Sequence, residues 1–248
     1  MHTSSRSNLQ LKMATSPPPK VKICCIADEA EARLAVTHGA AAIGLVSAMP
    51  SGPGVIDDAT VARVAAALRG EPVRSFLLTA RTTADGIAAQ HAAAGTTTLQ
   101  LVDHVPLPEL QRLRTLVPGV ELVQVVHVTG AAALAEALAV APFVDALLLD
   151  SGNPQAAVKQ LGGTGRTHDW ALARRIRDAV FPRPLWLAGG LRVHNVAEAI
   201  ATVQPNGLDL CTGVRNQGRL DAATLAAFMH AVQTADSADS ADSAKALR

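Results

Sequence analysis

The feature that most constrains this chain is a regular alternation of short apolar runs with stretches rich in Ala and Leu. The apolar runs are rich in Leu and β-branched residues and are bounded by turn residues, as expected of strands that are buried on both faces. Eight such runs occur, at residues 21–25, 42–47, 73–79, 97–102, 121–128, 144–150, 184–188 and 207–212.

The stretches between the runs have the apolar spacing of helices, as in residues 58–69 and 131–141, and one more covers 219–232. Alternation of strands and helices implies parallel strands joined by right-handed crossovers. An open doubly wound sheet is one solution, but eight units are many for it, and no Gly-x-Gly-x-x-Gly motif follows the first run. The sequence therefore predicts an α/β fold with a single (β/α)8 TIM barrel.

The two ends of the chain differ in composition from the alternating part. Residues 1–20 are polar and close with three consecutive prolines, and residues 234–248 contain a repeated Ala-Asp-Ser unit. Low-complexity segments of this kind bury too little apolar surface to order themselves. We therefore expect disordered extensions at residues 1–20 and 234–248, and one folded domain over residues 21–233.

Composition argues against several classes of function. With 22 Lys and Arg against 21 Asp and Glu, the net charge is +1, whereas proteins that bind nucleic acid usually carry a clear basic excess. No apolar run approaches the length of a membrane span. The sequence thus predicts no nucleic-acid partner and no membrane partner.

The three cysteines, Cys24, Cys25 and Cys211, are too few for a disulfide framework or a four-thiolate zinc site. Adjacent cysteines in a strand also point apart, which disfavours a metal site built from all three. We expect no metal site. A reduced, cytoplasmic location fits these thiols and the lack of an apolar secretory segment in residues 1–20.

In a (β/α)8 barrel the chemistry lies in the loops that follow the strands. Three of those loops contain glycines, at residues 161–170, 188–191 and 211–215. Glycine lets backbone N–H groups approach an anion, and the loops after the last two strands commonly hold phosphate, although glycine at such a turn also serves turn geometry alone. We therefore predict a small phosphorylated substrate, bound by Gly163, Gly165, Gly189, Gly190, Thr212 and Gly213.

Alternation along the first run places Lys22 and Cys24 on one face and Cys25 on the other. The apolar neighbours of Lys22 suit the helix-facing side, so we expect Lys22 and Cys24 inside the barrel and Cys25 in the helix layer. A buried ammonium needs a partner, and Asp209 in the last run, which closes against the first, is the expected one. A lysine beneath Cys24 favours the thiolate that a base needs; the alternative is a packed, inert cysteine.

Asp150 closes an apolar run of three leucines at the expected rim of the barrel. A carboxyl group in such a partly desolvated position has a raised pKa, which suits a general acid. The alternative is an aspartate that caps a helix or a turn and takes no part in catalysis.

Several of these residues belong to short motifs that follow one another over residues 21–230. The motifs are Lys22-Ile23-Cys24, the run ending in Asp150, Gly-Gly-Thr-Gly at 162–165 with Asp169-Trp170, Leu-Ala-Gly-Gly-Leu at 187–191, and Asp209 before Thr212-Gly213-Val214. Together they resemble the phosphoribosylanthranilate isomerase family.

The resemblance implies a (β/α)8 barrel that works without a cofactor. It implies an aldose–ketose isomerase that carries out an Amadori rearrangement of N-(5-phosphoribosyl)anthranilate in tryptophan biosynthesis. It gives Cys24 the position of the general base and Asp150 that of the general acid, and it assigns the phosphate to the glycine-rich loops.

The sequence departs from the family's pattern at the end of the site that meets the aromatic acid. Residues 51–54 replace a Ser-Pro-Arg motif whose arginine meets the anthranilate carboxylate, Cys25 replaces a glycine, Val102-Asp103 replaces His-Gly, and Arg215 replaces a glutamate. If phosphoribosylanthranilate is the substrate, we expect Arg215 or Arg81 to supply the replacement cation.

Two other functions stay open from the sequence. One is a related barrel isomerase that acts on another phosphorylated sugar or amine. The other is a non-catalytic barrel that binds a phosphorylated metabolite or a partner protein, but a pure binder needs no pair of an acid and a base. We expect a monomer or a homodimer.

Overall fold

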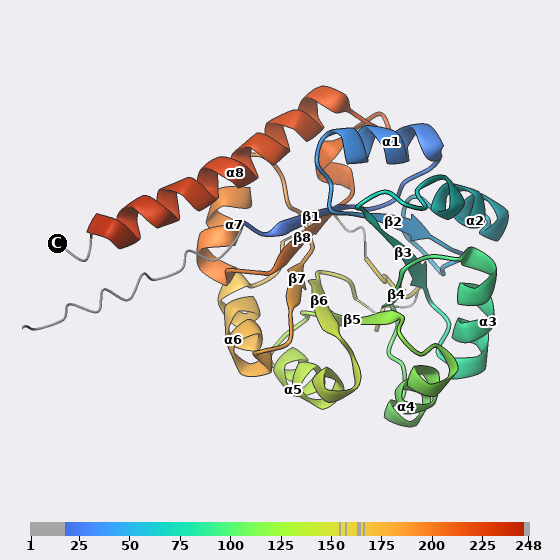
Figure 1. The fold of residues 1–248 in the computed structure, drawn as a ribbon. Coiled ribbons are helices and arrows are strands. Elements are labelled where there is room, and N and C mark those ends of the chain that lie inside the picture. Colours follow the sequence, from blue (N-terminus) through green and yellow to red (C-terminus); the bar gives the residue numbers. More distant parts are fainter. Residues whose placement is uncertain (1–17, 154, 157, 163–164, 166, 246–248) are drawn as a thin grey trace, which may run out of the picture.

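The computed structural model describes residues 18–153, 155–156, 158–162, 165 and 167–245. Eight parallel strands form one closed barrel in chain order, so the predicted (β/α)8 barrel is confirmed (Figure 1). The strands are β1 (Lys20–Ile23), β2 (Ala42–Val46), β3 (Arg74–Thr79), β4 (Thr98–Leu101), β5 (Glu121–His127), β6 (Ala146–Asp150), β7 (Leu185–Leu187) and β8 (Gly207–Leu210).

Helices form a ring outside the barrel (Figure 1). They are α1 (Glu29–Thr37), α2 (Asp58–Ala67), α3 (Ala84–Ala94), α4 (Leu107–Leu116), α5 (Ala132–Val140), α6 (Trp170–Val180), α7 (Val196–Val203) and α8 (Ala222–Lys245). Aspartates start several of them: the carboxylates of Asp28, Asp57 and Asp169 each accept a hydrogen bond from a backbone N–H in the first turn. Short 3-10 helices η1 (Ala141–Phe143) and η2 (Thr212–Val214) and a hairpin of β9 (Arg215–Asn216) and β10 (Arg219–Leu220) complete the chain.

Alternation along the strands divides the core into two layers. In β6, Ala146 and Leu148 belong to a cluster inside the barrel, whereas Leu147 and Leu149 pack in the layer between strands and helices. Because side chains alternate with a period of two, Asp150 continues the inward face at the rim. The sequence pattern therefore predicts correctly which way this strand faces.

The C-terminal segment differs from the expectation of a disordered tail from residue 234. Helix α8 continues without a break to Lys245. The repeated unit is one-third alanine, the best helix former, and it follows a segment that is already helical, so each further residue adds a hydrogen bond without a new nucleus. Of the residues predicted to be disordered at the other end, 1–20, residues 1–17 lie outside the described residues, whereas Lys20 begins β1.

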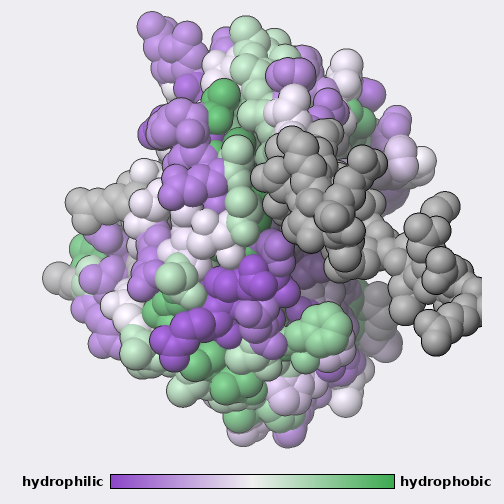
Figure 2. All heavy atoms as spheres, turned by 90° about the vertical axis from the view of Figure 1, so that its left-hand side faces the viewer, coloured by the Kyte–Doolittle hydropathy of each residue, from purple (hydrophilic) through white to green (hydrophobic). Residues whose placement is uncertain are grey.

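The outer face of the helices is mixed in character. Figure 2 shows one side of the molecule, on which hydrophilic and apolar residues are interspersed. This pattern is typical of helices that pack one apolar face inward and leave the other in water. In the part of the chain that the structure describes, no helix is long and apolar enough to cross a membrane.

Candidate active site

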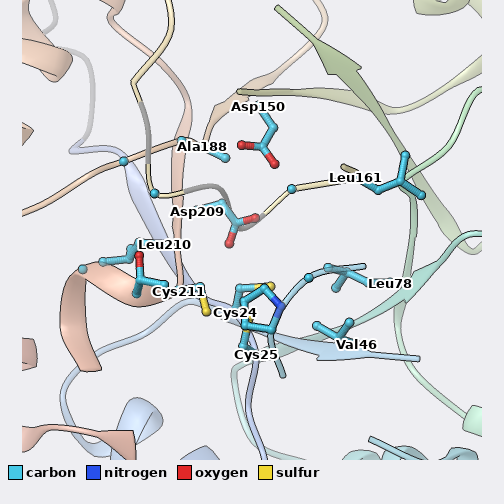
Figure 3. Close-up of a pocket in the computed structure, with 18 of the residues that line it drawn as sticks. Cys24, Cys25, Val46, Leu78, Asp150, Leu161, Ala188, Asp209, Leu210 and Cys211 are labelled. Carbon is cyan, nitrogen blue, oxygen red and sulfur yellow. The ribbon is translucent and has the colours of Figure 1, made fainter. Parts of the chain in front are cut away.

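A pocket opens at the carboxyl end of the barrel, where the sequence placed the chemistry. Residues at strand ends, among them Cys24, Gln100, Asp150 and Asp209, contribute to its wall (Figure 3). Loops after β2, β6, β7 and β8 complete it. This is the end of the fold at which (β/α)8 enzymes bind their substrates.

Lys22 and Asp209 form an ion pair inside the barrel, as predicted. Lys22 Nζ donates to Asp209 Oδ2 at 2.8 Å, and the two residues are neighbours in the register of β1 and β8. The Lys22 side chain is 0% exposed. Burial is the largest single influence and lowers the pKa of Lys22, but the charge and hydrogen bond of Asp209 together with the nearby Cys24 and Cys25 outweigh it, so the pKa is raised and the lysine stays charged.

Cys24 faces the barrel interior directly above this pair. A Cβ built on Gly44 in β2 would lie 2.8 Å from Cys24 Sγ and 3.1 Å from Lys22 Nζ. Only glycine leaves room there for both side chains, so the lysine and the thiol are held next to each other. The predicted inward orientation of Lys22 and Cys24 is confirmed.

Cys25 does not face the helix layer, and that prediction is wrong. β1 ends at Ile23, and Cys25 adopts the left-handed conformation with φ of 61°. The alternation of a strand no longer applies beyond its last residue, so the side chain of Cys25 lines the same pocket as Cys24. The family's glycine suits this conformation; here a cysteine adopts it.

Asp150 faces the pocket from β6, across from Cys24 (Figure 3). Its Oδ1 accepts a hydrogen bond of 2.7 Å from the backbone N–H of Ser151, and a Cβ on Gly162 would lie 2.6 Å from its Oδ2. The loop after β6 thus packs directly over the carboxyl group. Burial raises the pKa of Asp150 above its ordinary value, although the Ser151 hydrogen bond and His127 act in the opposite direction.

The glycine-bearing loops after β6, β7 and β8 meet at one edge of the pocket. Five of the six predicted phosphate residues line it, namely Gly165, Gly189, Gly190, Thr212 and Gly213. The sixth, Gly163, lies outside the described residues. Four of the five lie in the loops after β7 and β8, where (β/α)8 enzymes frequently bind phosphate.

Replacing Gly213 with Ala is expected to raise KM on the order of tenfold or more for a phosphorylated substrate. The new Cβ would lie 2.1 Å from the backbone O of Leu191, so the loops after β7 and β8 must move apart. Steady-state kinetics measure the effect. Gly119→Ala is the control, because its φ of +80° strains an alanine, but no atom lies within 4 Å of the new Cβ. An unchanged KM in Gly213→Ala would contradict the phosphate assignment.

Arg215 does not supply a cation to the pocket. Its side chain is 8% exposed and forms an ion pair with Glu31 at 3.0 Å. Arg215 Nη2 also donates to the backbone oxygens of Cys24 at 3.2 Å and Cys25 at 2.6 Å. The expectation that Arg215 meets a substrate carboxylate is therefore not supported: the guanidinium holds the turn after β1.

Arg81, the other candidate cation, is exposed and lies after β3. A Cβ on Gly86 in α3 would lie 3.6 Å from Arg81 Cδ and 3.8 Å from Arg81 Nη1. The Arg81 side chain therefore lies along the first turn of α3. No lysine or arginine is found among the described residues that line the pocket.

Gln100 is a pocket residue that the sequence interpretation missed. It lies in β4, is 3% exposed and lines the pocket. Within the described part of the chain, its Oε1 has no hydrogen-bond partner, which leaves an acceptor free for a ligand. The available signal was a polar side chain inside an otherwise apolar run, because a polar group is costly to bury without a hydrogen-bond partner.

The described residues contain no group of three or more His, Cys, Asp or Glu side chains that is placed to hold a metal ion. The chemistry that the pocket offers is that of a thiol and a carboxyl group on opposite walls, beside an edge suited to an anion. Such a pair can add a proton at one atom of a bound molecule and remove one at another.

Known proteins are similar to this chain in both sequence and fold. The chain is 36% identical over 211 residues to the N-(5'-phosphoribosyl)anthranilate isomerase of Synechococcus elongatus, which covers 84% of this chain and 93% of that relative. It is 35% identical over 217 residues to the enzyme of the same name from Haloferax volcanii, with 87% and 94% covered. The crystal structure of phosphoribosyl anthranilate isomerase from Thermotoga maritima superposes with a TM-score of 0.74 at 26% identity, covering 87% of this chain and 99% of that one.

The family itself is also matched directly. Residues 84–231 match the family described as N-(5'phosphoribosyl)anthranilate (PRA) isomerase. The match spans more than half of the chain, and the relatives are similar over nearly their whole length. This chain belongs to the phosphoribosylanthranilate isomerase family.

Proposed function

We propose that this chain is an isomerase that converts N-(5'-phosphoribosyl)anthranilate to the corresponding 1-deoxyribulose 5-phosphate, a step of tryptophan biosynthesis. The observation that carries the proposal is the placement of Asp150 and Cys24 on opposite sides of one pocket in a member of this family. An Amadori rearrangement needs one group of each kind.

Asp150 acts first, as the general acid. Its buried carboxyl group has a raised pKa, so a larger fraction stays protonated and delivers a proton to the ring oxygen of the ribose. The ring then opens to an iminium ion, which makes the proton on C2 acidic.

Cys24 completes the reaction as the general base. Its thiolate, next to the Lys22 ammonium, removes the C2 proton and leaves an enolamine, which becomes the ketone by tautomerisation. The charge of Lys22 is balanced by Asp209, whose Oδ2 accepts the hydrogen bond from Lys22, while Asp209 Oδ1 has no hydrogen-bond partner among the described residues.

The phosphate of the substrate binds at the edge formed by Gly165, Gly189, Gly190, Thr212 and Gly213. We propose that the sugar then lies across the mouth of the barrel, between the acid and the base. We also place the reaction in the cytoplasm, since all three cysteines are free thiols, as is usual in a reducing compartment.

The test is turnover of freshly prepared phosphoribosylanthranilate by the purified protein and by Cys24→Ala. The variant is expected to lose about 10²–10⁴-fold in kcat, because it lacks the base. Cys25→Gly is the matched control: it removes the neighbouring thiol, its φ of 61° suits glycine, and it is expected to lose far less activity. Absence of turnover in the unmodified protein, together with failure to restore growth without tryptophan to an isomerase-deficient strain, would contradict the substrate assignment.

A second candidate is an isomerase of the same chemistry that acts on another phosphorylated sugar or amine. It is favoured by one observation: no described residue of the pocket wall is a lysine or arginine that would bind an aromatic carboxylate. A charge-assisted hydrogen bond is worth roughly 1.5–3 kcal/mol. A KM that stays the same when the carboxylate of the substrate is replaced by an amide would support this second candidate.

A further inference from the structure

Three cysteines meet at the ends of β1 and β8, and only Cys24 has a part in the reaction described above. The side chains of all three line the same pocket, and the thiol of Cys25 interacts with those of Cys211 and Cys24. All three are free in the structure. Figure 3 shows their side chains in one group on the pocket wall.

The backbone explains why the thiols meet. Cys24 N donates to Leu210 O at 2.8 Å, so the ladder between β1 and β8 continues just beyond the last strand residues. Cys25 adopts the left-handed conformation just after β1, and its side chain lines the pocket together with those of Cys24 and Cys211. Gly54 packs against it, since a Cβ there would lie 2.4 Å from Cys25 Cβ.

Cys25 and Cys211 differ in chemical character. The neighbouring Cys25 thiol, together with the charge of Arg215, lowers the pKa of Cys211, although burial acts in the opposite direction. The interaction with Cys211, the interaction with Cys24 and burial raise the pKa of Cys25. Cys211 is half-buried, while Cys25 is only 6% exposed. The cysteine with the lowered pKa is therefore also the more accessible of the two, and it lies beside a covered thiol with a raised pKa.

We propose that Cys25 and Cys211 are a redox-sensitive thiol pair: a peroxide oxidises Cys211, and Cys25 then closes a disulfide across the ends of β1 and β8. In the first step the Cys211 thiolate attacks one oxygen of hydrogen peroxide, the O–O bond breaks, and hydroxide leaves, which takes up a proton to become water. In the second step Cys25 attacks the sulfur of the sulfenic acid, the S–O bond breaks, and a second water leaves. Two thiols lose two electrons in total, and one peroxide is reduced to two waters.

The disulfide would act on the site from both strands. It links the turn that carries Cys24 to the residue just before Thr212 and Gly213, which line the phosphate edge. Drawing the two sulfurs to bonding distance shifts both segments. Oxidised enzyme is therefore expected to lose most of its activity, and a dithiol reductant is expected to restore it.

The bond itself is tested by mass spectrometry on the full-length protein. The protein is treated with hydrogen peroxide, free thiols are blocked with N-ethylmaleimide, and trypsin digestion follows without reductant. Trypsin leaves Cys24 and Cys25 together in residues 23–33, and Cys211 in residues 193–215. We expect a cross-linked pair of these two peptides that disappears after dithiothreitol.

Variants identify the partners. The cross-link is expected to persist in Cys24→Ser and to be lost in Cys25→Ser and Cys211→Ser, with Cys25→Gly and Cys211→Ala as replacements if a serine variant does not fold. A cross-link lost in Cys24→Ser but kept in Cys25→Ser would overturn the assignment in favour of Cys24. A disulfide within residues 23–33, or over-oxidation without any disulfide, would overturn it as well.

Activity gives the functional half of the test. Peroxide-treated Cys211→Ala is expected to keep its own starting activity, while the unmodified protein loses activity in proportion to the cross-linked fraction. Equal loss in both would show that oxidation of Cys24 causes inactivation and that the pair is no switch. The mass measurement needs no turnover, so failure of the substrate assignment and failure of the thiol pair are separate outcomes.

Discussion

Asp150→Asn is expected to lower kcat by about 10²–10⁴-fold while KM changes little, because the amide keeps the shape of the carboxyl group but has no acidic proton to give. Asp150 Oδ1 accepts the N–H of Ser151 at 2.7 Å, and an amide oxygen accepts the same bond. Steady-state kinetics with the preferred phosphorylated substrate measure the change.

A matched control comes from a second buried acid at the same rim. Asp103 is 8% exposed like Asp150, but its Oδ2 binds Lys159 Nζ at 2.6 Å, and it is not part of the pocket wall. Asp103→Asn is therefore expected to lose much less activity than Asp150→Asn. Equal losses in the two variants would contradict the role of Asp150 as the acid.

The pKa of Asp150 also predicts how activity depends on pH. Because burial raises this pKa, kcat is expected to fall as pH rises through the raised value. The remaining activity of Asp150→Asn is expected not to show this decrease. A pH–rate profile of both proteins makes the comparison.

The same raised pKa predicts that stability also falls as pH rises. The folded state holds the proton more tightly than the unfolded state, so the stability is full below the ordinary value of 3.8 and falls as pH rises through the raised folded value. Asp150→Asn does not ionise, and it is therefore expected to unfold at a higher urea concentration than the unmodified protein above that window. Urea unfolding at low and neutral pH would show whether Asp150→Asn is more stable than the unmodified protein only at the higher pH.

Breaking the ion pair of Lys22 and Asp209 is expected to have the largest effect on stability. Lys22→Met or Asp209→Asn alone should cost about 3–5 kcal/mol of unfolding free energy, because each leaves the partner charge buried without compensation. The pair lies at 2.8 Å with side-chain exposures of 0% and 7%. Urea or thermal unfolding at neutral pH gives the values.

The double variant Lys22→Met with Asp209→Asn completes a double-mutant cycle, which measures the coupling between the two residues. It is expected to lose much less than the sum of the single variants, since it removes both charges together. Asp178→Asn serves as the exposed control: Asp178 is 51% exposed and pairs with Arg174, so its loss should cost only about 0.2–1 kcal/mol. Additive losses in the double variant would mean that the two residues stabilise the barrel independently.

Alkaline pH should weaken the same pair. The pKa of Lys22 is raised above 10.5 in the folded state, so its stabilising contribution is complete below 10.5 and is lost as pH rises through the folded value. The difference in unfolding free energy between the unmodified protein and Asp209→Asn is therefore expected to become smaller only in that alkaline range.

The sequence by itself determined the barrel and the inward orientation of Lys22, Asp150 and Asp209, which lie within strands. The eight apolar runs predict β1–β8 to within about two residues at each end, because strands buried on both faces need unbroken apolar runs bounded by turns. Alternation within β6 and β8 predicts the inward orientation of Asp150 and Asp209. The pairing of Lys22 with Asp209 followed from closing β8 against β1 and from the cost of an unpaired buried charge.

Only the tertiary structure decided what happens beyond the strand ends. Cys25 lies two residues after β1, and a positive φ there directs its side chain into the pocket, which no periodicity predicts. Arg215 lies in β9, outside the barrel, where its position depends on Glu31 in α1, far away in the sequence. The meeting of Cys25 with Cys211 depends in the same way on a turn and on the closure of the barrel. Periodicity is a property of a regular backbone, whereas loop side chains are placed by contacts between distant segments, which a local pattern does not contain.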